Sequence, residues 1–253
     1  MHHAVKTVSR DISVVDEHGS REQALSITNN ALQNKSPEER VAWSMGCLPG
    51  VHAVTSSFGA QAAVMLRLVT LAEPGIPVIL IDTGYLFAET YRFIDELTHR
   101  LQLNLKVYRP DTSAAWQEAR YGQRWDQGID GIKDYNTENK VAPMERALVD
   151  LDVSTWFAGL RRSQSSGRAG RQILEGTEAR WKVHPVIDQT DRDIHKFLKH
   201  HNLPYHPLWE KGYLSIGDYH STRSVLEVSD HSELRFQGLT RECGIHEIDL
   251  AKL

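Results

Sequence analysis

Short apolar runs alternate with segments of helical pattern through the first two thirds of the chain. Four of the runs have the length of buried strands and end at turn residues: 51–55, 77–81, 103–108 and 154–160. Helical patterns at 62–71 and 87–101 lie between the first three runs. This alternation favours a parallel sheet with helices on both faces, so the sequence predicts an α/β fold.

Local signals mark where further elements begin. Ser36, Pro37 and Glu39 predict the start of a helix that runs to about residue 47, because Ser caps, Pro suits the first turn and Glu completes a capping box. Turn residues near the middle of 173–183 predict a hairpin. Thr190 predicts the capped start of a later helix.

Composition supports one sizeable folded domain with flexible ends. The chain has 253 residues, 40% of them hydrophobic, and a formal net charge of -4. We expect a loosely ordered N-terminal arm at 1–22, a nucleotide-binding α/β domain at 23–217 and a C-terminal tail at 218–253 that can close over a site. The modest charge argues against general nucleic-acid binding.

The chain contains no apolar run long enough to span a bilayer, and its first twenty residues show no signal core. A cytoplasmic protein without membrane attachment is therefore expected. Two cysteines do not make a disulfide framework and cannot supply a four-thiolate site from one chain. No pair among the 13 histidines has a metal-site context, so no metal is predicted.

Three loops follow predicted strands, and ligands of parallel sheets bind beyond the carboxyl ends of the strands. Residues 56–61 offer hydroxyls, amides and a glycine at a helix start, which suits phosphate, although most such turns are plain connections. Residues 82–84 can place polar groups against a ribose or base. Residues 161–171 carry four arginines and no acidic residue, a pattern that indicates anion binding. Lys140 lies in a polar helical region, and sequence alone favours a solvated lysine there.

Cys243 is the candidate nucleophile. Arg241 and His246 flank it and can lower the pKa of a thiol, although a lone tail cysteine is more often a surface residue without a function. Cys47 lies in an apolar helical pattern and is expected to pack as a small hydrophobe.

Five motifs together resemble a known family. They are Ser56-Ser57-Phe58-Gly59-x-Gln61, the run from Ile81 to Thr90, Gly159-Leu160-Arg161-Arg162-x-Gln164-Ser165, Tyr213 to Asp218 and Arg241-Glu242-Cys243-Gly244-Ile245-His246. In this order they resemble the thioredoxin-dependent phosphoadenylyl-sulfate (PAPS) reductases of assimilatory sulfate reduction, a route to cysteine biosynthesis. The resemblance extends from about residue 40 to residue 246.

The resemblance implies an adenine-nucleotide α-hydrolase-like fold of five strands, related to the PP-loop pyrophosphatases, and usually a homodimer. It makes Cys243 the catalytic nucleophile. The other residues that it implicates all bind substrate: Ser56, Ser57, Phe58, Gly59 and Gln61 in the phosphate loop; Asp82, Thr83 and Gly84 at the adenosine; Lys140, Arg161, Arg162, Gln164, Ser165 and Arg168 at phosphate and sulfate; Arg235, Arg241 and His246 at the transferring group. Ala88 and the order Ser166-Gly167-Arg168 depart slightly from the family pattern.

The resemblance also implies a reaction without a bound cofactor. The related adenylyl-sulfate (APS) reductases carry an iron–sulfur cluster on two cysteine pairs, and the matching positions here are Val141-Ala142 and Asp218 to Ser221. The cluster-free branch of the family typically uses the 3'-phosphorylated nucleotide, so the resemblance implies PAPS as substrate. No second cysteine lies near Cys243, so an external dithiol is required, and the resemblance identifies it as thioredoxin or glutaredoxin.

Three alternative hypotheses about the function remain open. The first is a cluster-free APS reductase. The second is a PP-loop ATP pyrophosphatase, whose typical loop Ser-Gly-Gly-x-Asp-Ser has a second glycine and an aspartate that residues 56–61 lack. The third is a nucleotide-binding regulator without chemistry, for which a tail thiol with cationic neighbours would have no use.

Overall fold

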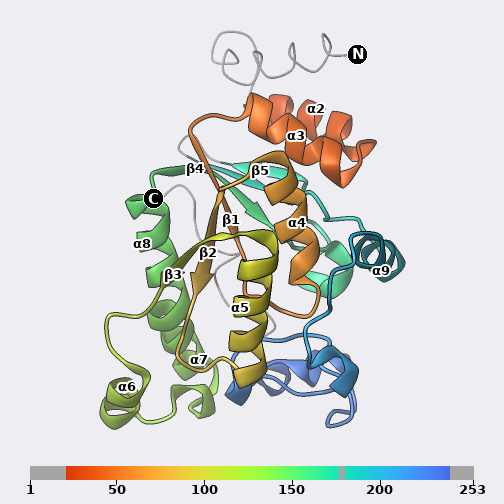
Figure 1. Ribbon diagram of the computed structural model, residues 1–253. Helices are drawn as coiled ribbons and strands as arrows, with labels where there is room; N and C mark the ends of the chain where they lie inside the picture. Colours follow the sequence, from red (N-terminus) through yellow and green to blue (C-terminus); the bar gives the residue numbers. More distant parts are fainter. Residues whose placement is uncertain (1–20, 177–179, 240–253) are drawn as a thin grey trace.

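The computed structural model describes residues 21–176 and 180–239 (Figure 1). Arg241, Cys243 and His246 therefore lie outside the described residues, as does most of the predicted N-terminal arm. The strands are β1 (Val51–Thr55), β2 (Pro77–Ile81), β3 (Asn104–Tyr108), β4 (Val153–Ala158), β5 (Leu174–Gly176) and β6 (Trp181–Val183). The helices are α2 (Arg21–Gln33), α3 (Pro37–Cys47), α4 (Ala62–Ala72), α5 (Ala88–Leu101), α6 (Ala114–Tyr121), α7 (Gly128–Asn136), α8 (Ala142–Asp150) and α9 (Asp191–His200).

The strands form one sheet in the described part of the chain, in the order β3-β2-β1-β4-β6-β5. All neighbours pair in parallel except β5, which pairs antiparallel with β6 at the edge. The parallel sheet is confirmed. The resemblance implied five strands, and the structure has a sixth, β5, at the antiparallel edge. The predicted hairpin is β5–β6, and it extends this sheet instead of standing apart from it.

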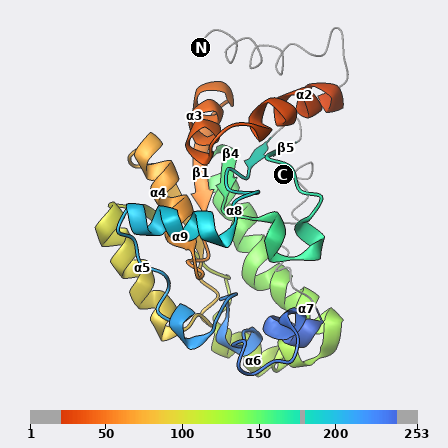
Figure 2. The ribbon, with the colours of Figure 1, turned by 90° about the vertical axis from the view of Figure 1, so that its right-hand side faces the viewer.

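Helices cover both faces of the sheet (Figure 2). On one face α4, α5 and α9 enclose a large core that includes Val54, Val78 and Phe157 from the strands. On the other face α8 packs Met144 and Leu148 against the opposite side of the same strands. Alternate residues of β1, β2 and β4 thus contribute to opposite cores, which explains why these central strands are rich in apolar residues.

Side-chain caps fix the starts of two predicted helices, α3 and α9. Ser36 and Glu39 form a reciprocal capping box at the start of α3, as expected. Thr190 and Asp193 form another at the start of α9. Asn29 of α2 hydrogen-bonds both the N–H and the C=O of Leu174, and so occupies backbone groups of edge strand β5.

Residues 218–239, the described part of the predicted tail, consist of short turns that pack against the α/β domain. Asp218 pairs with Leu86 and Thr222 pairs with Arg235 in isolated bridges. Asp218, Leu234 and Phe236 are buried. The predicted domain boundary after residue 217 therefore has packed residues on both sides. A separate tail domain remains a prediction.

Buried His206 gives a prediction about pH. Its Nδ1 accepts a hydrogen bond from the Leu208 N–H, and its Nε2 lies 3.0 Å from the Thr90 hydroxyl. Burial lowers the pKa of His206 from 6.5 to about 4, so the unfolded chain takes up a proton below pH 6.5 that the folded protein excludes. The free energy of unfolding should therefore fall by about 3 kcal/mol from this group as the pH drops from 6.5 to 4.

Urea unfolding at several pH values measures this slope. His206→Gln keeps a neutral polar side chain, so the slope between pH 6.5 and 4 should become shallower by the same amount. An identical slope in the variant and the unchanged protein would contradict the assignment.

Candidate active site

A cavity of about 540 Å³ lies beyond the carboxyl ends of β1, β2 and β4. Thr55 from β1, Ile81 from β2 and Gly159 after β4 all line it, so the site is where a parallel sheet places a ligand. Many of the predicted site residues line this cavity: Ser56, Ser57, Gly59, Gln61, Thr83, Lys140, Arg161, Gln164, Ser165, Arg168 and Arg235. Phe58, Asp82, Gly84 and Arg162 are not among its lining residues.

The loop between β1 and α4 is shaped by Phe58. This residue has a positive φ of 49° and is fully buried, so its ring anchors the loop in the core. Its N–H donates to the hydroxyl of Ser56, 3.1 Å away. A bulky residue seldom adopts a positive φ, and it does so here because burial of the ring compensates for the backbone strain. Phe58 thus sets the loop conformation that leaves Ser57 and Gly59 at the cavity.

Arg161, three residues after β4, is the most firmly held cation of this loop. It is 6% exposed, and its Nη2 donates to Gln61 Oε1 at 2.6 Å and to Asp191 Oδ1 at 2.8 Å. Its Nη1 donates to the Gln189 carbonyl at 3.2 Å. These partners fix the guanidinium before any ligand binds. A pre-positioned arginine loses little conformational entropy when it binds an anion.

Only some of the other residues of the arginine loop line the cavity. Gln164 Oε1 accepts from the Arg161 N–H at 3.1 Å and from Arg168 Nη1 at 2.5 Å, so it links two of the predicted anion-binding residues. Arg162 instead directs its Nε to the Arg171 carbonyl, 2.9 Å away. The four arginines therefore do not all face one site.

Lys140 and Asp218 form a buried ion pair at the cavity wall. Lys140 is 5% exposed, and its Nζ lies 2.6 Å from Asp218 Oδ2, so the interpretation of a solvated lysine is wrong. Asp218 also accepts from the Thr83 hydroxyl at 2.5 Å and from the Tyr135 hydroxyl at 3.0 Å. Burial raises the pKa of Asp218, but Lys140 and the Thr83 hydrogen bond outweigh it and hold the pKa below its usual range.

The local backbone directs Lys140 toward this partner. Residues 137–141 form a π-helical turn between α7 and α8. Such turns widen the helix and re-aim side chains, and they occur frequently at functional sites. Lys140 consequently reaches the sheet end instead of solvent.

Arg235 brings a further cation to the same wall. It is 8% exposed, and its Nε is buried without a hydrogen-bond partner among the described residues. Its charge also lowers the pKa of Asp218, after the larger effects of burial and Lys140. A buried guanidinium with an unused N–H is suited to receive an anion.

Gly217 is required for the position of Arg235. A Cβ atom at residue 217 would overlap the Arg235 guanidinium. Gly217→Ala should therefore displace this cation and weaken binding of the adenine nucleotide that the sequence predicts roughly tenfold, the equivalent of one charged hydrogen bond. Titration calorimetry with adenosine 3',5'-bisphosphate measures the change. Gly170→Ala, where an added Cβ meets no atom within 4 Å, is the control; equal affinities in both variants would refute the steric argument.

Both carboxylate oxygens of Asp82 are bound by other groups of the protein. Its Oδ1 accepts from the Tyr91 hydroxyl at 2.7 Å and from the Gly84 N–H at 3.0 Å, and its Oδ2 pairs with Arg109 at 2.8 Å. Asp82 thus holds the turn that places Thr83 in the cavity wall. A direct contact of Asp82 or Gly84 with a nucleoside remains a prediction.

An aromatic cluster supports the Lys140–Asp218 wall. His220 stacks on Trp125 with ring centroids 3.8 Å apart, and its Nε2 lies 3.2 Å from the Tyr135 hydroxyl. Burial, with a smaller effect of Lys140, lowers the pKa of His220 to about 4, so it is neutral at pH 7. The Tyr135 hydroxyl thus contacts both Asp218 and His220, and so connects the aromatic cluster to the ion pair.

Sequence reasoning missed Asp218 and Asp191, the acidic partners of Lys140 and Arg161, which are the two best-buried cations that line the cavity. Asp218 lay within a recognised motif but received no role. A buried lysine or arginine is usually paired with a carboxylate, so an acidic partner could have been expected for each cation. The sequence does not identify which aspartate or glutamate is that partner.

No three His, Cys, Asp or Glu side chains gather into a group suited to a metal ion within residues 21–176 and 180–239. The absence of a cofactor stays a prediction. None of the described helices is long and apolar enough to cross a membrane.

Comparisons with known proteins agree with this geometry. A family model described as the phosphoadenosine phosphosulfate reductase domain matches residues 51–224. The phosphoadenosine 5'-phosphosulfate reductase of Vibrio parahaemolyticus is 60% identical over 221 residues, 87% of this chain and 85% of the relative. The Klebsiella pneumoniae protein of the same name is 58% identical over 224 residues, 88% of this chain and 92% of the relative.

Solved structures show a similar fold. The phosphate complex of PAPS reductase from Candida auris is 26% identical with a TM-score of 0.69, and the match covers 79% of this chain and 97% of that one. The FMN adenylyltransferase of Candida glabrata, 16% identical with a TM-score of 0.56 over 87% of this chain and 72% of that one, shares the fold alone. The predicted adenine-nucleotide α-hydrolase-like architecture is confirmed.

Proposed function

Since this chain belongs to the phosphoadenosine phosphosulfate reductase family, we propose that it reduces PAPS to sulfite and adenosine 3',5'-bisphosphate by means of Cys243. The family match and the relatives confirm the family that the motifs indicated and its enzymatic activity. The roles of individual residues, the reductant and the assembly form the finer part of the proposal.

The observation that carries the proposal is the gathering of buried cations in one cavity of a protein with net charge -4. Arg161 is held by Gln61 and Asp191, while Lys140 and Arg235 adjoin Asp218. PAPS carries a phosphate and a phosphosulfate, so it has several negative charges to bind. Fixed guanidinium groups pair with phosphate or sulfate oxygens through two parallel hydrogen bonds, which orients the substrate as well as binding it.

The same cavity has an apolar wall suited to a nucleobase. Met65 and Ile194 come from helices on one face of the sheet, and Met144 comes from α8 on the other. Ile79 and Ile81 of β2 complete the wall. An adenine ring can bury its faces there, while the charged groups of the nucleotide reach the cations.

In the proposed step the thiolate of Cys243 attacks the sulfur atom of the sulfate group. A sulfur–sulfur bond forms, and the bond between sulfur and the bridging phosphate oxygen breaks, which yields S-sulfocysteine and adenosine 3',5'-bisphosphate. The leaving phosphate oxygen gains negative charge. Arg235, Arg241 and His246 are proposed to stabilise that charge.

The enzyme then needs two electrons. One thiolate of a reduced thioredoxin or glutaredoxin attacks the Cys243 sulfur and expels sulfite, and the second thiol of the partner resolves the mixed disulfide. Cys243 returns as a thiol and the partner leaves as a disulfide. We place this reaction in the cytoplasm, with a homodimer as the assembly and no iron–sulfur cluster.

A rate comparison of PAPS with APS, with reduced thioredoxin and sulfite release as the readout, tests the proposal. A site that pairs charges with the 3'-phosphate discriminates strongly against an analogue without it, so kcat/KM should be at least roughly tenfold higher for PAPS. Equal or better use of APS would favour the cluster-free APS reductase. Release of pyrophosphate from ATP without any sulfite would favour the pyrophosphatase.

A further inference from the structure

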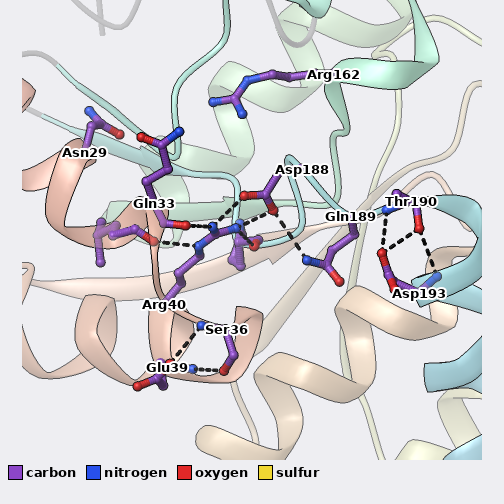
Figure 3. Close-up of polar contacts among 12 residues, drawn as sticks. Asn29, Gln33, Ser36, Glu39, Arg40, Arg162, Asp188, Gln189, Thr190 and Asp193 are labelled. Carbon is purple, nitrogen blue, oxygen red and sulfur yellow. Dashed lines mark hydrogen bonds and ion pairs between the residues drawn. The ribbon is translucent and has the colours of Figure 1, made fainter.

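Arg40 of α3 is among the largest fully buried side chains of the described chain, although it carries a charge and does not line the cavity. It is 1% exposed, and all three of its guanidinium nitrogens are used (Figure 3). Its Nε and Nη2 donate to the carbonyls of Leu32 and Gln33, each at 3.0 Å, at the end of α2. Its Nη1 donates to the Pro185 carbonyl at 2.8 Å.

Asp188 supplies the counter-charge through two hydrogen bonds. Arg40 Nη1 donates to Asp188 Oδ1 at 2.7 Å and Nη2 donates to Oδ2 at 2.6 Å, so the guanidinium and the carboxylate meet side by side (Figure 3). Burial raises the pKa of Asp188, but the hydrogen bond and charge of Arg40 prevail and lower it. Arg40 is buried, while the Asp188 side chain is 32% exposed, so the carboxylate keeps contact with solvent. The two parallel charged hydrogen bonds fix the backbone of residue 188 relative to α3.

The segment that Arg40 fixes also holds the arginine loop of the active site. Residues 184–190 connect β6 to α9. The Ile187 carbonyl accepts from the Arg162 N–H at 2.8 Å, and the Gln189 carbonyl accepts from Arg161 Nη1 at 3.2 Å. Asp191, the first residue of α9, holds Arg161 Nη2 at 2.8 Å. Three contacts of the arginine loop thus depend on where residues 187–191 lie.

We propose that Arg40 and Asp188 are positioning residues that act through residues 187–191 to hold Arg161 in the geometry required for anion binding. This inference rests on the proposed function, because it takes Arg161 as a ligand of the nucleotide. Neither residue touches the cavity. Their effect on binding is indirect and passes through the Gln189 carbonyl and the Asp191 carboxylate.

The first test is the affinity for adenosine 3',5'-bisphosphate, measured by calorimetry well below the unfolding temperature of each variant. Asp188→Asn removes the charge and one acceptor oxygen but keeps the shape, and its dissociation constant should rise about tenfold. Glu39→Gln is the matched control. It makes the same kind of carboxylate-to-amide change at an exposed residue of α3, next to Arg40 in the sequence. Its affinity should stay unchanged.

A purely structural role would lower the unfolding temperature of Asp188→Asn and leave its dissociation constant unchanged at the lower temperature of the titration. That result would overturn the proposal. If Asp188→Asn does not fold, Arg40→Lys is measured in its place. Lysine keeps the charge but cannot form the paired hydrogen bonds, so a loss of affinity is again expected, and an unchanged constant would again overturn the proposal.

A double-mutant cycle separates this inference from the proposed function. In an Arg161→Ala background the Asp188→Asn substitution should have almost no further effect on binding, because its route of action is gone. A full tenfold loss in that background would show that Asp188 acts by another route and would refute the positioning role. If Arg161→Ala alone leaves binding intact, the proposed pocket itself fails.

Discussion

Cys243→Ser should abolish sulfite formation from PAPS while nucleotide binding persists. A serine hydroxyl at neutral pH is a far weaker nucleophile than a thiolate, so we expect the rate to fall by roughly 10⁴-fold or more, as when other enzymes lose their nucleophile. The assay is sulfite release with reduced thioredoxin in excess. The dissociation constant of adenosine 3',5'-bisphosphate should change little, because the binding cations of the cavity remain in place.

Cys47→Ser is the matched control for this loss. Cys47 is half-buried at the end of α3 and packs against the main core, in agreement with its expected structural role. Its replacement should cost some stability but preserve turnover. Sulfite formation by Cys243→Ser at a rate near that of the unchanged protein would remove the proposed mechanism.

Arg161→Ala should give the second large effect, a loss of nucleotide affinity of about 30-fold or more. Truncation of a buried, hydrogen-bonded charge at a binding site typically costs about 2 kcal/mol or more. It would also leave Asp191 without its counter-charge near the bound anion. The loss should be greatest at low ionic strength, because salt screens the attraction that the variant lacks.

Arg162→Ala serves as the control within the same loop. Its guanidinium is directed to the Arg171 carbonyl and does not line the cavity, so its removal should weaken binding much less than that of Arg161. Calorimetry at two salt concentrations measures both variants. Equal losses would contradict the division of the loop that the structure indicates.

Local patterns in the sequence were sufficient to predict the parallel sheet. Strands β1, β2 and β4 are rich in apolar residues because helices pack on both faces of the sheet. The capping boxes at Ser36 and Thr190 mark the starts of α3 and α9. The position of the β5–β6 hairpin was not predictable in this way. Its place beside β4 depends on the pairing of Phe157 with Val183, which no local signal records.

The candidate site was predictable where it follows strand ends, and less so where it depends on distant partners. Arg161 and Thr83 lie beyond β4 and β2, and both line the cavity as expected. Lys140 was misread as solvated because its burial depends on Asp218, far away in the sequence. The direction of Arg162 away from the cavity likewise depends on the Arg171 carbonyl, which a motif cannot reveal.

The most direct test of the account is a mass spectrum of the reduced protein after incubation with PAPS in the absence of thioredoxin and glutaredoxin. The account predicts the mass of one sulfo group on the peptide that contains Cys243, together with one equivalent of adenosine 3',5'-bisphosphate. Addition of reduced thioredoxin should then remove the group and release sulfite. Nucleotide product without any sulfo group on Cys243 would contradict the central claim.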